Sequence, residues 1–144
     1  MLTLGRLVVA VIGLATVALF GHLGLMDLRD WVSFALEGGP LHHLRVGSPT
    51  EAAFSLGLAI ASLVGLAFLS GWRGERQLWI GAALIGVGPA AIAGPVLKNA
   101  VSYTLRASFR PEDWVAVLAW GGAAAVCAAV AISLRRAPDA HPAT

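Results

Sequence analysis

The stretch LVVAVIGLATVALFGHLGLM at residues 7–26 decides the fold, because its 20 residues include no Lys, Arg, Asp or Glu. As a helix, about 20 apolar residues are long enough to cross the roughly 30 Å hydrocarbon core of a bilayer. Three further uncharged stretches of 21 residues each lie at residues 52–72, 77–97 and 114–134. The sequence therefore predicts an all-α membrane protein that folds as a four-transmembrane-helix bundle.

The composition of the chain agrees with this class and narrows it. Hydrophobic residues make up 58% and charged residues 12%, whereas soluble domains carry about 25% charged residues. We expect one four-span domain at residues 1–136 and a disordered tail at residues 137–144. The net charge of +2 is small and the basic residues are scattered, which argues against nucleic-acid binding. The single cysteine, Cys127, excludes an internal disulfide.

The connection between the first two spans begins with a predicted amphipathic helix at residues 27–37. Its apolar residues recur at helical spacing, and its polar residues lie off that face. The apolar residues are Leu28, Trp31, Val32, Ala35 and Leu36. Such a helix tends to lie in the membrane interface, so we expect a short interfacial helix between spans 1 and 2. Gly38, Gly39 and Pro40 are expected to end it.

The remaining connections set the arrangement of spans 2, 3 and 4. The link at residues 71–76 is short, so spans 2 and 3 are predicted to be antiparallel neighbours. Proline removes a backbone hydrogen bond inside a helix, so Pro89 should kink span 3 near its middle. Pro95 adds a second weak point near the end of that span.

Orientation is predicted from the arginines that flank the spans. Each side of the membrane carries five Lys or Arg residues, but those on the side of both termini lie closest to the span ends. These are Arg6, Arg73, Arg76, Arg135 and Arg136. The composition, rich in Ala, Gly, Val and Arg, is typical of bacteria with GC-rich genomes. We therefore expect a multi-pass protein of the bacterial inner membrane with both termini in the cytoplasm.

Small residues recur every four positions in three of the spans. They allow close helix contact in lipid, where no hydrophobic driving force brings helices together. In span 2 they are Gly57, Ala61 and Gly65; in span 3 Ala82, Gly86, Ala90 and Gly94; in span 4 Gly121, Ala125, Ala129 and Ser133. We predict that such faces dock helices or partner subunits, with Gly57, Ala61 and Gly65 as the named candidates.

Two polar clusters are candidate binding sites. His22, His42 and His43 are the candidate cofactor ligands, since neutral imidazole binds zinc, copper or haem iron. No cysteine or carboxylate stands beside them at ligand spacing, so we expect no metal site and most simply no cofactor. The second cluster combines basic and aromatic residues suited to lipid headgroups or a partner. Its members are Trp31, Lys98, Tyr103, Arg106 and Arg110.

The chain lacks the usual motifs of membrane enzymes and pumps. It has no Gly-x-Ser-x-Gly or His-Glu-x-x-His motif, and its spans hold no charged residue. We therefore expect a non-catalytic accessory subunit of a larger membrane complex, in contact with lipids and with other integral membrane subunits. Two alternatives stay open. One is a small oligomeric transporter or channel that uses the kinked span 3. The other is a haem- or metal-binding redox protein that uses His42 and His43.

Overall fold

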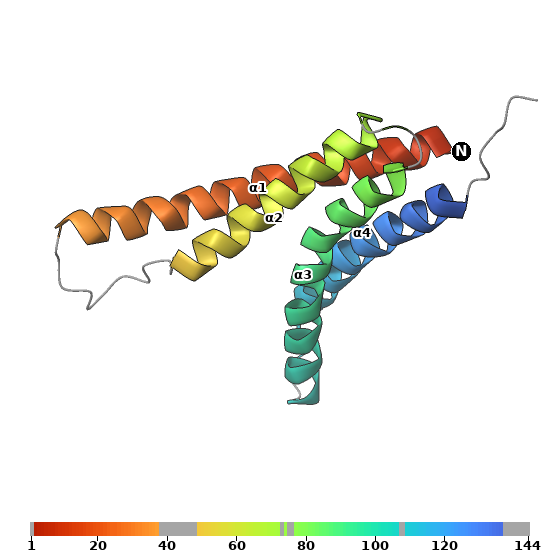
Figure 1. The fold of residues 1–144 in the computed structure, drawn as a ribbon. Helices are drawn as coiled ribbons and strands as arrows, with labels where there is room; N and C mark the ends of the chain where they lie inside the picture. Colours follow the sequence, from red (N-terminus) through yellow and green to blue (C-terminus); the bar gives the residue numbers. More distant parts are fainter. Residues whose placement is uncertain (1, 38–48, 73, 75–76, 107–108, 137–144) are drawn as a thin grey trace, which may run out of the picture.

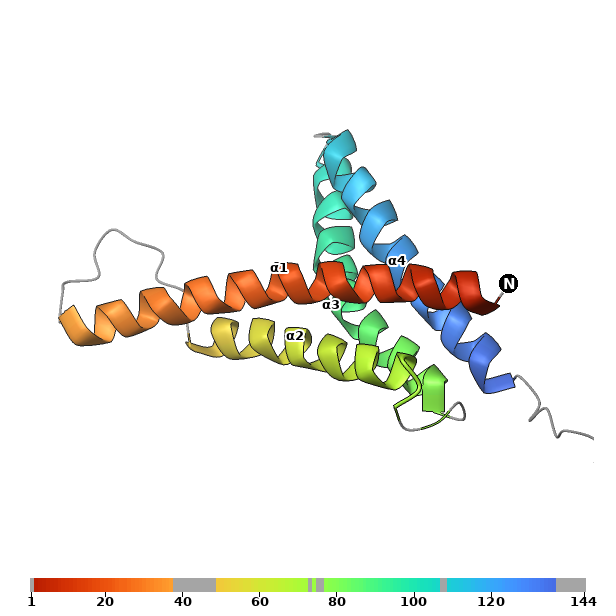
Figure 2. The same ribbon diagram turned by 90° about the horizontal axis from the view of Figure 1, so that it is seen from above.

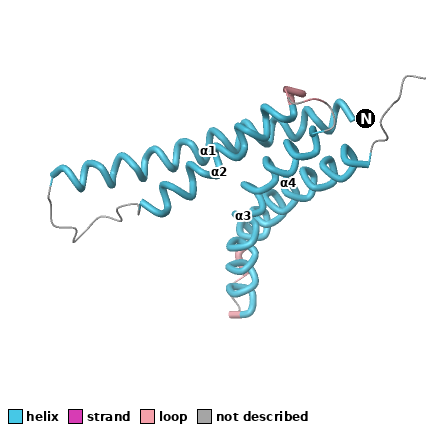
Figure 3. Tube along the Cα trace, in the orientation of Figure 1, coloured by secondary structure: helices cyan, strands magenta, loops and turns pink. Residues whose placement is uncertain are grey.

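A computed structural model describes residues 2–37, 49–72, 74, 77–106 and 109–136, which form helices and turns with no strand. The helices are α1 (Leu2–Glu37), α2 (Pro49–Leu69), α3 (Leu78–Leu105) and α4 (Pro111–Arg136), shown in Figures 1 and 3. All four are long and apolar enough to cross a membrane. The all-helical part of the sequence prediction is confirmed, and four candidate spans suggest a multi-pass membrane protein.

Helix α1 is longer than its predicted span. It runs without a break for 36 residues, a rise of about 54 Å at 1.5 Å per residue. Residues 27–37 are helical as predicted, but they continue α1 and do not form a separate short helix. No proline interrupts this part of the chain, so the helical backbone hydrogen bonds continue. The predicted stop at residues 38–40 lies outside the described residues.

The four helices form two antiparallel hairpins, α1 with α2 and α3 with α4 (Figures 1 and 2). The hairpins meet where the start of α1, the α2–α3 link and the end of α4 come together. We call this the convergent end. From there the two hairpins spread apart, and we call the opposite ends of the helices the divergent end. The last turns of α1 extend past the start of α2.

The link between α2 and α3 turns the chain back within a few residues. Gly71 and Gly74 have φ angles of +86° and +93°, a conformation that side chains with a Cβ rarely adopt. The Gly71 N–H donates to the Phe68 carbonyl at 3.0 Å, and the Gly74 N–H donates to the Gly71 carbonyl at 2.9 Å. These glycines let α3 start beside the end of α2, as the short link predicted.

The backbones of α2 and α3 come very close where they cross. A Cβ added at Gly65 would lie 2.8 Å from the Gly81 carbonyl oxygen, and one at Gly81 would lie 2.5 Å from the Gly65 carbonyl oxygen. Any side chain larger than hydrogen is excluded at this crossing. Gly65 therefore packs against α3 inside the chain, opposite Gly81, which the predicted series of small residues did not include.

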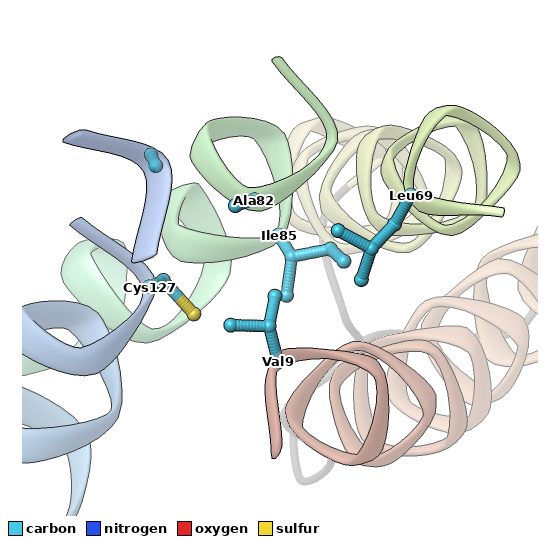
Figure 4. Packing of buried hydrophobic residues seen from close by; sticks show 6 residues of the cluster. Val9, Leu69, Ala82, Ile85 and Cys127 are labelled. Atoms are coloured by element: carbon cyan, nitrogen blue, oxygen red, sulfur yellow. The ribbon is translucent and has the colours of Figure 1, made fainter. Parts of the chain in front are cut away.

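The main hydrophobic core lies at the convergent end and takes residues from every helix. It consists of Val9 from α1, Leu69 from α2, Ala82 and Ile85 from α3, and Cys127 and Ala131 from α4. Figure 4 shows the sulfur of Cys127 pointing toward Val9, with Ile85 between Val9 and Leu69. A second cluster of Phe20, Leu58 and Ala59 joins α1 to α2 and packs against Ala91 and Ile92 of α3.

Helix α3 changes direction along its length, as both ribbon views show (Figures 1 and 2). Pro89 lies inside this helix and is buried. Because proline has no N–H, the carbonyl of Ile85, four residues earlier, loses its usual donor. The bend directs the second half of α3 away from the α1–α2 hairpin.

Candidate functional site

The three small residues predicted as a docking face on α2 do not share one surface. Gly65 is buried against Gly81 of α3, and Ala61 is half-buried. Gly57 is exposed, and a Cβ added there would meet nothing within 4 Å. Only Gly57 is therefore free to contact a partner closely, while Gly65 holds two helices of this chain together.

The small residues of α3 are divided in a similar way. Ala82 is part of the main core, and a Cβ at Gly86 would lie 3.0 Å from the Cβ of Cys127 in α4. Ala90 is exposed, and a Cβ at Gly94 would meet nothing within 4 Å. The first half of the α3 series thus packs inside the chain, and the second half does not.

Helix α4 is the least covered of the four helices. Its 26 residues include only two buried ones, Cys127 and Ala131. Away from the core, four exposed residues follow one another at spacings of three and four and form one face, which we call the α4 ridge. The ridge consists of Gly122, Val126, Ala129 and Ser133.

The α4 ridge is smooth and has no unsatisfied hydroxyl. A Cβ at Gly122 would meet nothing within 4 Å. The Ser133 hydroxyl donates to the Ala129 carbonyl at 2.8 Å, so it needs no hydrogen-bond acceptor from a neighbouring helix. The sequence series placed Ala129 and Ser133 on this face but missed Gly122 and Val126. No signal in the sequence marked these two residues, because their exposure depends on how the helices pack.

An apolar groove of about 630 Å³ lies on the α3–α4 hairpin. All of its lining residues come from these two helices. They are Trp79, Ala83, Gly86, Val87 and Ala90 from α3, and Ala124, Ala125, Ala128, Ala131, Ile132 and Arg135 from α4. At one end, the Arg135 guanidinium carbon lies 5.5 Å from the centre of the Trp79 ring, within the range of a cation–π contact. No local pattern predicts this pairing, since the two residues are far apart along the chain.

The predicted basic and aromatic cluster is brought together only in part. The Arg110 guanidinium carbon lies 4.6 Å from the centre of the Tyr103 ring. The nearby Trp114 ring N–H donates to the Thr104 hydroxyl at 3.2 Å. Lys98 is exposed on α3 at the same divergent end, and Arg106 is exposed directly after the end of α3. Trp31 is also exposed, but it belongs to α1 in the other hairpin.

The histidine hypothesis stays a prediction. His22 is exposed on α1, while His42 and His43 lie outside the described residues. Among the residues that the structure describes, no three His, Cys, Asp or Glu side chains gather as metal ligands would. Cys127 is a free, buried thiol in the main core.

Charge is distributed unevenly between the two ends of the molecule. Arg6, Arg135 and Arg136 lie at the convergent end, where the described chain contains no acidic residue. The acidic residues of the described chain all lie toward the divergent end. They are Asp27, Asp30, Glu37, Glu51, Glu112 and Asp113. Arg135 therefore places a positive charge at the end of the apolar groove.

Comparison of the chain with known protein families, with curated proteins and with solved structures found no match in any of the three.

Proposed function

We propose that this chain is a non-catalytic accessory subunit of a larger complex in the bacterial inner membrane, and that it docks through the α4 ridge. The observation that carries the proposal is the exposure of α4. A helix of 26 residues with two buried ones leaves most of its surface uncovered by its own chain. A surface of small residues that its own chain leaves open suits contact with another membrane subunit.

The large apolar residues around the ridge support the same proposal. Val115 is 65% exposed and Leu118 is 74% exposed, at the start of α4. Membrane helices associate through van der Waals packing, and small residues beside larger ones let a second helix approach and interlock. The ridge with its larger neighbours has this composition.

The lack of charged residues in the predicted spans favours an accessory role over transport or catalysis. Residues 7–26, 52–72, 77–97 and 114–134 contain no Lys, Arg, Asp or Glu. Pumps and ion-coupled transporters usually place ionisable groups inside the membrane, where they stabilise a moving charge. We propose accordingly that this subunit stabilises the assembly of other subunits that carry the chemistry.

The proposed orientation places the convergent end, with both termini, in the cytoplasm, because its arginines lie close to the span ends. At the other surface, the last turns of α1 would leave the hydrocarbon, since α1 rises about 54 Å and the core is about 30 Å thick. Residues 27–37 would then form an interfacial extension of α1, with Trp31 at headgroup level.

A small oligomeric transporter or channel is the second candidate, and one observation favours it. Ser62 is fully buried, and its hydroxyl has no hydrogen-bond partner. The neighbouring helix α3 bends and contains Pro89. An open hydroxyl and a broken helix are features of transport sites. This arrangement offers one polar group and no charge, so we rank it second.

Copurification from the native membrane tests the proposed function. The tagged full chain, Ala129→Leu and a matched control, Ala53→Leu, are extracted in mild detergent and analysed by mass spectrometry. Ala53 is exposed like Ala129 but lies on α2. We expect the wild type and Ala53→Leu to bring down the same larger subunits, and Ala129→Leu to lose most of them.

Two outcomes would contradict the proposal. If Ala129→Leu retains its partners as well as Ala53→Leu does, the α4 ridge is not the docking surface. Purification of the wild type as a lone monomer or homo-oligomer that moves a solute across liposomes would favour the transporter.

A further inference from the structure

We propose that the groove on the α3–α4 hairpin binds one acyl chain of an anionic phospholipid, and that Arg135 binds the phosphate of its headgroup. The lipid belongs to the leaflet at the convergent end. This site goes beyond the proposed function, because it lies on a different face of α4 from the ridge and does not depend on a partner subunit.

The length of the groove matches the depth of one leaflet. On α3 it extends from Trp79 to Ala90, and on α4 from Ala124 to Arg135. Each wall therefore rises about 16 Å at 1.5 Å per residue. Half of the roughly 30 Å hydrocarbon core is about 15 Å. A lipid acyl chain that enters beside Arg135 would reach the middle of the bilayer where the groove ends.

The walls of the groove are suited to a flexible hydrocarbon chain. Most of the lining residues are Ala or Gly, so the two helix surfaces stay open over the length of the groove. Ala83, Ala125 and Ala128 are exposed there, which leaves their methyl groups available for contact. The groove is apolar throughout, apart from its end at Arg135.

Charge complementarity identifies the headgroup. The Trp79 ring holds the Arg135 guanidinium at the mouth of the groove. Guanidinium donors fit phosphate oxygens well. Arg6 and Arg136 lie at the same end and add to the attraction for a headgroup with net negative charge.

Lipid titration of the purified full chain tests the headgroup. The probes are phosphatidylglycerol and phosphatidylcholine with identical acyl chains, and the readout is native mass spectrometry. We expect wild type to retain phosphatidylglycerol in preference to phosphatidylcholine. Arg135→Gln should weaken phosphatidylglycerol binding about tenfold, through loss of charge-assisted hydrogen bonds. The matched control Arg136→Gln, which removes the same charge outside the groove, should retain most of the binding.

Filling the groove tests the acyl chain. Ala128→Leu should weaken binding of both lipids, whereas Ala129→Leu, one residue along on the ridge, should leave it unchanged. Ala83→Leu narrows the other wall and provides a second variant if Ala128→Leu does not fold. A photoreactive amino acid at position 128, activated in native membranes, should attach to lipid.

Three results would overturn the proposal. Equal losses for Arg135→Gln and Arg136→Gln would show general attraction between charges and no site. Unchanged binding in folded Ala128→Leu and Ala83→Leu would show that no chain occupies the groove. Crosslinking of position 128 to a protein would identify a partner helix as the occupant. If Ala129→Leu loses its partner subunits but still binds lipid, the docking surface and the lipid site are separate, and the lipid proposal stands.

Discussion

Glycine has opposite roles at two positions of α2. At Gly65 a Cβ would approach the Gly81 carbonyl oxygen at 2.8 Å and the Ile85 side chain at 2.8 Å, whereas at Gly57 it would meet nothing within 4 Å. In the sequence, both glycines belong to the same series of small residues at every fourth position. Their difference depends on which of them faces α3.

Substitution of these glycines gives a direct test of the α2–α3 crossing. Gly65→Ala should destabilise the protein by about 1–3 kcal/mol, because the added methyl group forces the two backbones apart. Gly57→Ala, the matched control, should leave the melting temperature in detergent unchanged. Equal melting temperatures for the two variants would show that α2 and α3 do not cross at Gly65.

Ser62 is one of three described residues, with Arg6 and Asp113, that have a buried polar side-chain atom without a hydrogen-bond partner. Its side chain is fully buried and its hydroxyl has no partner, whereas the buried Thr16 hydroxyl donates to the Ile12 carbonyl at 2.7 Å. An unsatisfied buried hydroxyl costs about 1–3 kcal/mol. The hydroxyl of Ser62 therefore opposes folding unless something outside this chain binds it.

Removal of that hydroxyl distinguishes the two candidate functions. If the chain is an accessory subunit, Ser62→Ala should leave the thermal stability unchanged or raise it, because a buried polar group is lost without a broken bond. The stability is measured by thermal unfolding in detergent, with Ala61→Ser as a control for polarity next to this position. A clear loss of stability in Ser62→Ala would show that the hydroxyl binds a water or solute, and would favour transport.

At the scale of the element, the bend in α3 sets how far the two hairpins spread. Both Pro89 and Pro95 lie inside α3, but Pro89 is buried and Pro95 is exposed. A proline inside a helix removes one backbone hydrogen bond and crowds the preceding turn. A bend at Pro89 therefore changes the direction of the second half of α3.

Replacement of this proline should straighten the helix. Spin labels at the exposed positions Ala83 and Val101, in a Cys127→Ala background, lie on the two sides of Pro89. A straight helix would separate their backbones by about 27 Å. The wild type should give a shorter distance, Pro89→Ala should lengthen it, and Pro95→Ala should change it less. An unchanged distance in Pro89→Ala would show that packing against α1 and α4, rather than the proline, bends α3.

At the scale of the whole molecule, the two hairpins share a core only at the convergent end. Val9, Leu69, Ile85 and Cys127 meet there from the four helices, and Phe20 with Leu58 extends the contact toward the middle. Beyond these clusters the hairpins separate, and many large apolar side chains are exposed. In a membrane, lipids or other subunits cover such surfaces.

The orientation of the whole molecule is a separate prediction. We expect both termini in the cytoplasm, because Arg6, Arg135 and Arg136 lie next to span ends at the convergent end. A fluorescent protein fused after Thr144 should fold and emit, and alkaline phosphatase fused at the same position should be inactive. Active phosphatase at that position would reverse the orientation and would move the proposed lipid site to the outer leaflet.

The sequence by itself determined the four helices and their approximate ends. Length and lack of charge are properties of each segment alone. The four candidate spans could therefore be recognised without reference to one another, at residues 7–26, 52–72, 77–97 and 114–134. Local signals also placed the bend in α3 and the tight turn after α2. The continuity of α1 through residues 27–37 was missed, because a polar and amphipathic pattern permits either a new helix or an extension of the old one.

Only the tertiary structure decided which side of each helix faces inward. In a soluble protein the apolar face marks the core, but in a membrane helix apolar residues occupy every face. Small residues repeat on α2, α3 and α4. Nothing local distinguishes Gly65, which packs against α3, from Gly57, where an added Cβ would meet nothing within 4 Å. For the same reason the exposure of the α4 ridge and the pairing of Arg135 with Trp79 depend on how the helices rotate and pack, which no single segment encodes.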